Sequence, residues 1–404
     1  MDYGRILGLI LDVGAGMIRS GAETHRVEDS LYRLCTSYGF SACNIWVVPS
    51  NIQATVTASD GVCLTQIRHI RRAGVNFERL DRLNDLSRRV CTDPPGPDAL
   101  ERLLQEALRT APQPVWINCL AGVLAGAGFG VFFNCDGPDA LVTVCAALLI
   151  TFLIRAVGKR EENPLILNFL ISCVAEFFII FSVRLGFGHH TGYITLGVVM
   201  LLISALGATN GLRDLVHLDT LSGVMNITAS LTGAIGIALG IALPLSLLRG
   251  WASNELTGLN PSVPIQLISC TIACVGFALW FHVRGRQVPW CGLGALLTWA
   301  AYRVGLRLGA GVFSATLLAS AFCGLYGQVM ARVNRAPATI FLTVSIFPLI
   351  PGAALYYMMY GIVTRDAALG IGKGAELLLT CFGIVLGYMA VEVLSKYIWR
   401  HHGQ

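Results

Sequence analysis

Charge is the property that this sequence lacks most. Only 13% of its 404 residues are Asp, Glu, Lys or Arg, against about 25% in an ordinary globular domain. Hydrophobic residues make up 54%, and the mean hydropathy is +0.65. This composition excludes a disordered or collagen-like chain, and a net charge of +5 is too weak a field for a nucleic-acid binder. The scarcity of charge predicts a protein whose surroundings are largely lipid.

The sequence also lacks metal-binding cysteine motifs. None of its 13 cysteines belongs to a C-x-x-C pair or to a Cys/His cluster at metal-ligand spacing. Cys270 and Cys274 lie one helical turn apart in an apolar stretch, where free cysteine behaves as a small hydrophobic residue. We therefore predict no metal site and no cofactor, and we interpret His189 and His190 as solvated loop residues.

A secretion signal is absent as well. Residues 1–20 carry four charged side chains, too many for the apolar core of a signal peptide. The first long apolar stretch begins after residue 114. Residues 1–114 are therefore expected to remain in the cytosol.

Residues 1–114 predict a small cytosolic α+β domain. Apolar residues recur at helical spacing in residues 4–19, and a second helix begins at Glu23-Thr24 and ends at Gly39. Strand-like runs joined by turn residues come next, and two further helices close the domain. The runs cover residues 40–48, 52–58 and 62–70, and the closing helices cover residues 77–90 and 97–110.

Residues 115–404 contain about ten apolar stretches, each near the length of about 20 residues that spans a bilayer. Short loops on the side of the N-terminus hold about twice as many Arg and Lys residues as those on the other side. Both termini are therefore expected in the cytosol. The stretches cover residues 115–133, 138–157, 163–184, 192–210, 223–248, 262–283, 287–306, 310–330, 337–359 and 370–394.

A repeat relates the first five stretches to the last five. They superimpose at an offset of about 145 residues, with their loops in register. Because five is odd, the second set must cross the membrane in the opposite sense, which is the architecture of many secondary transporters. The predicted organisation is a first repeat at residues 115–250, an extracytoplasmic linker at 251–262 and a second repeat at 263–404.

Two stretches at corresponding positions, the fourth and the ninth, are interrupted by glycine or proline. Proline removes a backbone donor and breaks a helix, and the freed polar groups must lie against protein or a water-filled cavity. Paired interruptions point to a substrate site, which we favour over kinks that serve packing alone. The candidate residues at the interruptions are Gly207, Thr209, Asn210, Pro348, Pro351 and Gly352.

Residues 210–223 form the most polar stretch between residues 165 and 280. Arg213 can bind a carboxylate in a bidentate way, and Asp214 and Asp219 can hold an ammonium group or take up a proton. Ser222 opens the next helix, whose N-terminus favours an anion. The alternative is an ordinary cytosolic loop with Asp219 as a helix cap, and both interpretations remain open from sequence physics alone.

Glu176 lies in the middle of the third apolar stretch. A carboxylate at membrane depth is costly and is by default a functional candidate, here as a proton carrier. The alternative is a protonated glutamic acid that bonds to a neighbouring helix. The proton-coupling candidates are thus Glu176, Asp214 and Asp219.

Three groups of residues carry a resemblance to a known family. The segments SGAETHRVED at residues 20–29 and NDLSRR at residues 84–89 are typical of the family's beginning. Residues 210–223 resemble its N-x-x-R-D-x-x-x-G-D-x-x-S-G stretch, with Leu218 in place of the usual Gly. Residues 335–339 and 347–352 are similar to its second module. On these motifs nearly the whole chain resembles the threonine/serine exporter (ThrE) family.

The resemblance implies a mainly α-helical polytopic membrane protein, with about ten transmembrane helices as 5+5 inverted repeats and a small cytosolic α+β domain. It implies export of threonine or serine across the bacterial cytoplasmic membrane, driven by the proton motive force. Split two-chain relatives are associated with succinate export, so a dicarboxylate is the alternative substrate. The implied partners are a small-molecule substrate, protons and the lipid bilayer, and a homo-oligomer is left open.

A hypothesis of another class is a membrane-anchored hydrolase that uses the N-terminal domain, because that domain of the family has been described as hydrolase-like. The cluster of His25, Arg26, Glu28 and Asp29 is typical of a solvated helix face with ion pairs, and no nucleophile–base–orienter spacing accompanies it. We therefore expect a transporter and not an enzyme.

Overall fold

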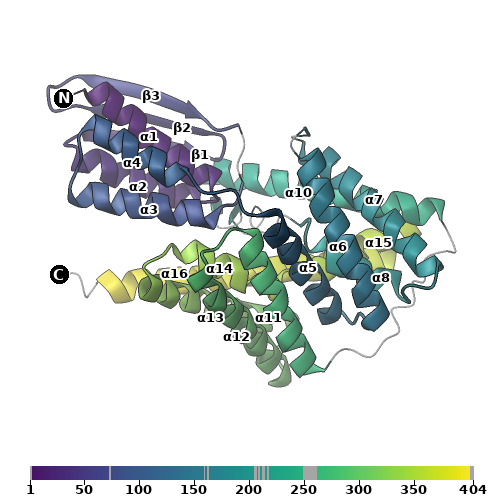
Figure 1. The fold of residues 1–404 in the computed structure, drawn as a ribbon. Helices are drawn as coiled ribbons and strands as arrows, with labels where there is room; N and C mark the ends of the chain where they lie inside the picture. The colour runs from purple at the N-terminus through teal and green to yellow at the C-terminus, as the bar shows by residue number, and fades with distance from the viewer. Residues whose placement is uncertain are drawn as a thin grey trace.

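The N-terminal unit (residues 3–108) combines four helices with a three-stranded antiparallel sheet (Figure 1). The computed structural model describes residues 2–71, 74–158, 160–161, 163–203, 207, 210–211, 214–215, 218–248 and 262–400. The helices of the unit are α1 (Tyr3–Arg19), α2 (Thr24–Ser37), α3 (Phe77–Thr92) and α4 (Pro97–Leu108). The strands β1 (Ser41–Val48), β2 (Asn51–Thr57) and β3 (Cys63–His69) pair in that order, as the two turn signals predict.

The alternation of apolar and polar side chains along β2 decides which face of the sheet is buried. Ile52, Ala54 and Val56 are buried, whereas the residues between them are half exposed. The buried face packs against the apolar helix α1, in which Ile6 and Ile10 are also fully enclosed. The period of two in the sequence thus becomes a sheet with one face covered by helices and the other open.

The helical bundle occupies residues 115–400. Among the described residues, seven of its helices are long and apolar enough to cross a membrane, and α14 with α15 adds an eighth as a bent pair. The helix α12 and the nine-residue helix α8 are not among them. The elements are α5 (Val115–Phe132), α6 (Gly137–Val157), α7 (Pro164–Arg184), α8 (Thr191–Val199), α10 (Thr220–Leu247), α11 (Val263–Trp280), η1 (Gly285–Gln287), α12 (Val288–Arg307), α13 (Val312–Asn334), α14 (Ala338–Ser345), η2 (Phe347–Leu349), α15 (Gly352–Thr364) and α16 (Ala367–Arg400).

Large apolar side chains cover the outside of this bundle. On α10, Leu231, Ile235, Leu239 and Leu243 succeed one another at helical spacing, and each is between 39% and 58% exposed. In water such a continuous apolar stripe would be a severe aggregation liability, whereas in a bilayer it faces lipid tails. The chain is therefore a multi-pass membrane protein.

Small residues allow the helices to approach closely. On α10, a Cβ added at Gly236 would lie 2.4 Å from the Leu165 carbonyl oxygen of α7. On α16, one added at Gly387 would lie 2.5 Å from the Leu317 carbonyl oxygen of α13. We refer to α5–α10 as the first half of the bundle and to α11–α16 as the second half. Each half thus contains one helix pair that is packed through glycines.

Helices are broken within both the fourth and the ninth apolar stretch. The fourth apolar stretch does not continue as one helix, because α8 ends at Val199 and residues 200–203 follow as turn and irregular backbone. Of the interruption predicted after them, only residues 207 and 210–211 are described. In the ninth, α14 and α15 are separated by η2 and bent by 48° at the two prolines, which cannot donate the missing backbone hydrogen bonds.

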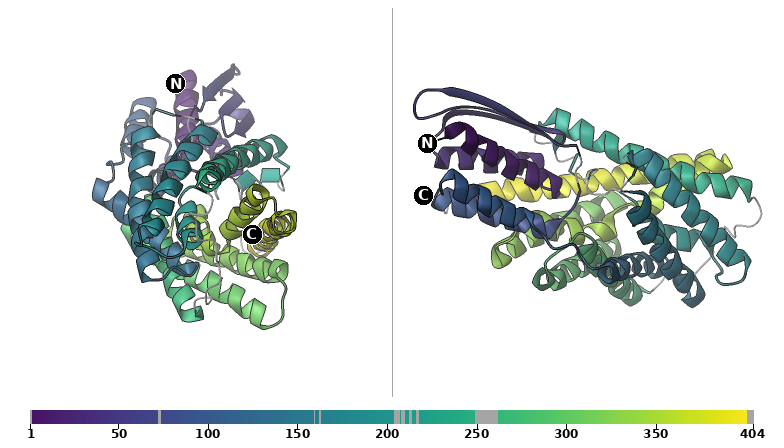
Figure 2. Two further views of the ribbon diagram at one scale, coloured as in Figure 1. Left: turned by 90° about the vertical axis from the view of Figure 1, so that its right-hand side faces the viewer. Right: turned by 45° about the horizontal axis from the view of Figure 1, so that its top comes forward.

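The N-terminal unit lies at one end of the bundle. The C-terminal end of α16 lies at the same end, as two further views make clear (Figure 2). Among the described residues, the unit contacts the segment before α10 and the loops between α11 and α12 and between α13 and α14. The opposite end carries the loop between α5 and α6 and the loop between α7 and α8, which hydrogen bonds connect.

The two halves meet where α5 packs against α11. A Cβ added at Gly276 would lie 2.4 Å from the Ala125 backbone nitrogen.

We expect Gly276→Ala to lower the thermal unfolding temperature of the detergent-purified protein, because the backbone of α5 cannot move aside. Gly372→Ala on α16, where nothing lies within 4 Å, is the matched control. It should leave the temperature equal or higher, because Ala favours a helix by about 1 kcal/mol over Gly. An equal response of the two variants would contradict this account of the interface.

Candidate functional site

A buried carboxyl group lies in the centre of the first half. Glu176 of α7 is 1% exposed, and Thr195 Oγ1 of α8 donates a hydrogen bond of 2.8 Å to its Oε2. Its other oxygen, Oε1, has no hydrogen-bond partner among the described residues. Tyr356 of α15 lies within electrostatic reach of the same carboxyl group. The acid thus lies between α7 and α8 with one oxygen unpaired among the described residues and Tyr356 of the other half in its vicinity, and it can take up a proton or bind a cationic group.

The break in the second half lies against the break in the first. Gly352, the first residue of α15, packs so closely on Met200 that an added Cβ would lie 2.4 Å from its sulfur. Ile203 lies 3.3 Å from the same point. On the other side of the break, Phe347 stacks on Phe277 of α11 with ring centroids 3.9 Å apart. Pro348 and Pro351 lie between these contacts, Pro348 buried in η2 and Pro351 preceding α15.

A second polar cluster lies where the N-terminal unit meets the first half, and its centre is Asp214. This carboxylate is 4% exposed and accepts hydrogen bonds from Thr24 Oγ1 (3.1 Å) and Asn226 Nδ2 (2.9 Å). Asp219, the residue before α10, donates its backbone N–H to the Asp214 carbonyl oxygen. Ser222 Oγ is 3.4 Å from the Val47 carbonyl oxygen, to which it donates.

The neighbouring residue of Thr24 reaches the other half. Glu23 is 7% exposed, and it accepts a hydrogen bond of 3.0 Å from Thr339 Oγ1 in the first turn of α14. Arg26 lies 3.3 Å from its second oxygen. One turn at the start of α2 therefore touches both halves of the bundle.

Two carboxyl groups of this junction have raised pKa values. Burial raises the pKa of Asp214 from 3.8 to about 6, and the carboxylates of Glu23 and Asp219 add to the rise, while the bonds from Asn226 and Thr24 oppose it. Burial, together with the smaller effect of the Asp219 charge, also raises the pKa of Glu28. Burial is thus the main cause of both shifts, and neighbouring carboxylates add a smaller part.

The predicted site residues therefore fall into two groups rather than one. Asp214, Asp219 and Ser222 belong to the junction with the N-terminal unit, and Gly352 belongs to the central break. Gly207 and Asn210 lie in helical backbone between α8 and α10. Thr209 and Arg213 lie outside the described residues.

Sequence reasoning missed four residues that the fold adds to these groups. Thr195 and Tyr356 surround Glu176, and Glu23 and Thr24 reach into the junction. For the first two no sequence signal existed, because threonine and tyrosine are ordinary in apolar helices. For Glu23 and Thr24 the available signal was the SGAET segment, because the start of an ordinary helix does not require that sequence.

The far end of the bundle carries paired histidines and aspartates. As predicted, the histidine side chains are in contact with solvent, His189 being 57% and His190 33% exposed. Each also pairs with a carboxylate: His189 Nδ1 lies 2.5 Å from Asp136, and His190 Nδ1 lies 2.8 Å from Asp139. Asp139 also accepts the backbone N–H groups of both histidines. One possible ligand atom from each of Asp136, Asp139 and His189 lies within 4.8 Å of the others. The hydrogen bonds that Asp139 accepts, however, attach the loop between α7 and α8 to α6.

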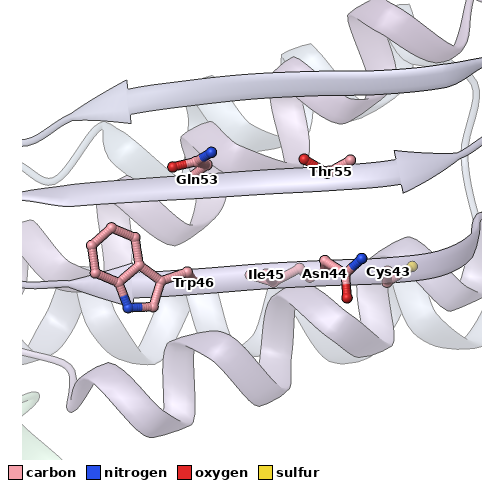
Figure 3. A pocket seen from close by; sticks show the side chains of 6 residues that line it. All are labelled: Cys43, Asn44, Ile45, Trp46, Gln53 and Thr55. Carbon is pink, nitrogen blue, oxygen red and sulfur yellow. The ribbon is translucent and has the colours of Figure 1, made fainter.

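The outer face of the sheet has an open hollow of about 400 Å³ (Figure 3). It is lined by Cys43, Asn44, Ile45, Trp46, Gln53 and Thr55. Burial raises the pKa of the Cys43 thiol, which is the opposite of what a nucleophilic cysteine requires. The hollow therefore gives no support to the hydrolase hypothesis.

The fold and the two polar clusters together define a multi-pass membrane protein with buried polar groups at broken helices. This architecture is typical of small-molecule transporters. Two family descriptions match the chain: "Putative threonine/serine exporter" at residues 8–248, and "Threonine/Serine exporter, ThrE" at residues 266–394. The chain belongs to the threonine/serine exporter family.

Two bacterial relatives are similar over nearly the whole chain. A protein of Corynebacterium glutamicum named "Threonine/serine exporter" is 23% identical over 412 residues, which are 98% of this chain and 83% of the relative. A protein of Mycobacterium tuberculosis (strain ATCC 25618 / H37Rv) named "Probable threonine/serine exporter" is 23% identical over 408 residues, 95% of this chain and 76% of the relative. Comparison with the solved structures gives no match.

Leu218 adopts a backbone conformation that suits glycine. Its φ is 67°, and it stands where the family stretch has Gly. A left-handed conformation costs a non-glycine residue about 1–2 kcal/mol, and Leu218 loses little packing because it is 86% exposed. We expect Leu218→Gly to raise the unfolding temperature. Leu221→Gly, at an exposed position inside α10, should lower it, and a rise in both would refute the argument from strain.

The raised pKa of Asp214 predicts a dependence of stability on pH. The folded protein binds this proton more tightly than the unfolded chain, so the contribution is full below pH 3.8 and is lost as the pH rises through about 6. The unfolding temperature should therefore fall over this range, and less steeply in Asp214→Asn. Asp60→Asn, in the turn between β2 and β3, is the control and should keep the wild-type slope. Equal slopes in wild type and Asp214→Asn would contradict a proton bound at this carboxyl group.

Proposed function

We propose that the protein is a secondary active exporter of threonine and serine, driven by the proton motive force. The observation that carries the proposal is the Glu176 carboxyl group, enclosed between α7, α8 and α15 beside the two helix breaks, with one oxygen unpaired among the described residues. A buried acid that can be charged or neutral couples proton movement to a conformational change, because its charge is tolerated only where a partner or water reaches it. The names of both relatives support the substrate class.

The proposal includes a 5+5 inverted repeat, with boundaries at residues 115–250, 251–262 and 263–404. Corresponding contacts support it. Gly236 and Gly240 pack on α7, and Gly383 and Gly387, each about 147 residues later, pack on α13. Ser172 Oγ donates to the Ile237 carbonyl oxygen across the first pair, and Ser320 Oγ donates to that of Gly383 across the second.

The proposed topology has both termini in the cytosol. The loops that touch the N-terminal unit are those that the distribution of positive residues assigns to the inside. Arg284, for example, pairs with buried Asp81 at 2.9 Å, and the Arg335 carbonyl oxygen accepts from Arg88. The paired aspartates and histidines then face the outside.

In the proposed mechanism, substrate is received from the cytosol and released outside as the halves rearrange around the breaks. Arg213 binds the substrate carboxylate, and Asp214 or Asp219 binds the ammonium group before transfer towards Gly352 and Glu176. Gly207, Thr209, Asn210, Ser222, Pro348 and Pro351 complete the proposed path. The names of both relatives favour an amino acid over the alternative substrate, succinate.

Transport assays on proteoliposomes test this function. Wild-type protein should release preloaded threonine under an imposed proton gradient, with serine competing and succinate not. In Glu176→Gln, which cannot ionise, gradient-driven efflux should fall at least tenfold while threonine exchange without a gradient persists. Glu376→Gln removes a half-exposed acid of α16 and should behave as wild type. Absence of threonine movement in wild-type vesicles, or succinate competition in its place, would refute the proposal.

A further inference from the structure

Thr195 of α8 has two acceptors for a single hydroxyl hydrogen. Its Oγ1 lies 2.8 Å from Glu176 Oε2 on α7 and 2.9 Å from the carbonyl oxygen of Thr191, one turn earlier on its own helix. A hydroxyl group carries one hydrogen and can also accept, so it donates fully to one of these oxygens at a time. Thr195 and Glu176 are each 1% exposed, so bulk water does not take the place of either partner.

The charge on Glu176 decides which oxygen receives this hydrogen. A carboxylate only accepts, and a hydrogen bond to a charged oxygen is about twice as strong as one between neutral groups. The charged form of Glu176 therefore draws the hydrogen of Thr195 away from Thr191. After a proton binds to Oε2, the carboxylic acid donates to Oγ1, and the hydroxyl hydrogen turns to the Thr191 carbonyl oxygen. One proton is gained at Oε2 in this step, and no covalent bond of Thr195 forms or breaks.

Other titratable groups surround this pair. Cys173 of α7 and Tyr356 of α15 lie within electrostatic reach of Glu176. A thiol and a phenol are ordinarily neutral near pH 7, whereas a carboxyl group can be charged. Further titratable side chains lie on or beside α8 and the loop before it: Asp136, Asp139, His189, His190, Tyr193 and Tyr357. Beside the hydroxyl group of Thr195, Glu176 is therefore the group whose charge can change.

The hydrogen of Thr195 also affects the shape of α8. A threonine that bonds the carbonyl oxygen four residues earlier often bends its helix, because the side chain competes with the backbone for that oxygen. The beginning of α8 is attached to α6, since Asp139 accepts two backbone N–H groups of the preceding loop. At its other end lies Met200, on which Gly352 of the second half packs. A change in the bend of α8 therefore acts on the contact between the two helix breaks.

We propose that Thr195 couples the protonation of Glu176 to the shape of α8 by exchanging the acceptor of its hydroxyl hydrogen. This inference rests on the proposed export function and adds to it the residue through which the proton acts. With Glu176 charged, Thr195 donates to the carboxylate and α8 lacks the side-chain bond to Thr191. With Glu176 neutral, that bond forms and α8 bends. Thr195 is thus a positioning residue, which acts through Glu176.

The variant Thr195→Val keeps the shape of the side chain and removes the hydroxyl group. In proteoliposomes, its gradient-driven efflux of preloaded L-threonine should fall about tenfold, the factor that corresponds to one hydrogen bond to a charged group. Threonine exchange without a gradient should persist, because the substrate path is unchanged. Thr195→Ser keeps the hydroxyl group and should restore most of the driven efflux.

Thr232→Val is the matched control. Thr232 of α10 donates to the Thr228 carbonyl oxygen, four residues earlier, at 2.7 Å and at a partly exposed position. The substitution should change neither driven efflux nor exchange. An equal loss of driven efflux and exchange in Thr195→Val would show that Thr195 only supports the structure, and it would overturn the coupling.

A double variant separates coupling from packing. In the Glu176→Gln background, the addition of Thr195→Val should not lower driven efflux further, because a side chain that cannot ionise does not redirect the hydroxyl hydrogen. Losses that multiply in the double variant would contradict the proposal.

Infrared difference spectroscopy of the reconstituted protein tests the hydrogen bond itself. Acidification of the wild type should produce a carboxylic acid band that is missing in Glu176→Gln. The frequency of this band should differ in Thr195→Val and return in Thr195→Ser, because the acid donates to Oγ1 only where a hydroxyl group is present. An unchanged frequency in Thr195→Val would overturn the proposal.

Failure of this inference is distinguishable from failure of the proposed function. Wild-type vesicles that move no threonine would overturn the proposed function. Normal driven efflux in Thr195→Val, beside an active wild type and an uncoupled Glu176→Gln, would overturn the role of Thr195 alone.

Discussion

An apolar environment leaves every polar group of the bundle dependent on a partner within the protein. Water cannot satisfy a carboxyl group or a broken turn at membrane depth, so each must be paired or enclosed. Glu176 has Thr195 as partner, and the chain around Pro348 is enclosed by Phe277 and Met200. The few polar groups that interrupt the apolar pattern are therefore also the groups around which the helices are arranged.

Close helix packing makes this enclosure feasible. Gly236 and Gly240 in one half, and Gly383 and Gly387 in the other, let pairs of long helices approach until side chains reach backbone. Such pairs behave as rigid bodies, because no space remains for sliding. The shorter broken helices lie between them, and change is easiest where regular hydrogen bonding is already interrupted.

The N-terminal unit fits this division of the bundle. Among the described residues, it is tied to the second half through backbone hydrogen bonds and a buried ion pair, and to the first half through side-chain hydrogen bonds. A neutral hydroxyl group that meets a buried carboxyl group forms a bond that is specific but easily exchanged for water or a cation.

Much of this architecture was predictable from local patterns. The period of two in residues 52–56 predicts the buried face of β2, and the lengths of the apolar stretches predict most of the long helices. The prolines of the ninth stretch predict its bend, because the missing donor is a property of the residue itself. The end of α8 at Val199 was not predictable to the residue, since apolar side chains continue beyond it without a breaker.

Such local patterns could not predict contacts between residues that are far apart in the sequence. Thr24 and Asp214 are 190 residues apart, and Glu23 and Thr339 are 316 apart, so no spacing in the sequence links them. The sequence alone determined the solvation of each segment, and with it which parts prefer lipid, which prefer water, and where a helix must break. Which acid meets which hydroxyl group, and which half holds the N-terminal unit, was decided only by tertiary packing, because such contacts depend on the relative placement of segments and not on their composition.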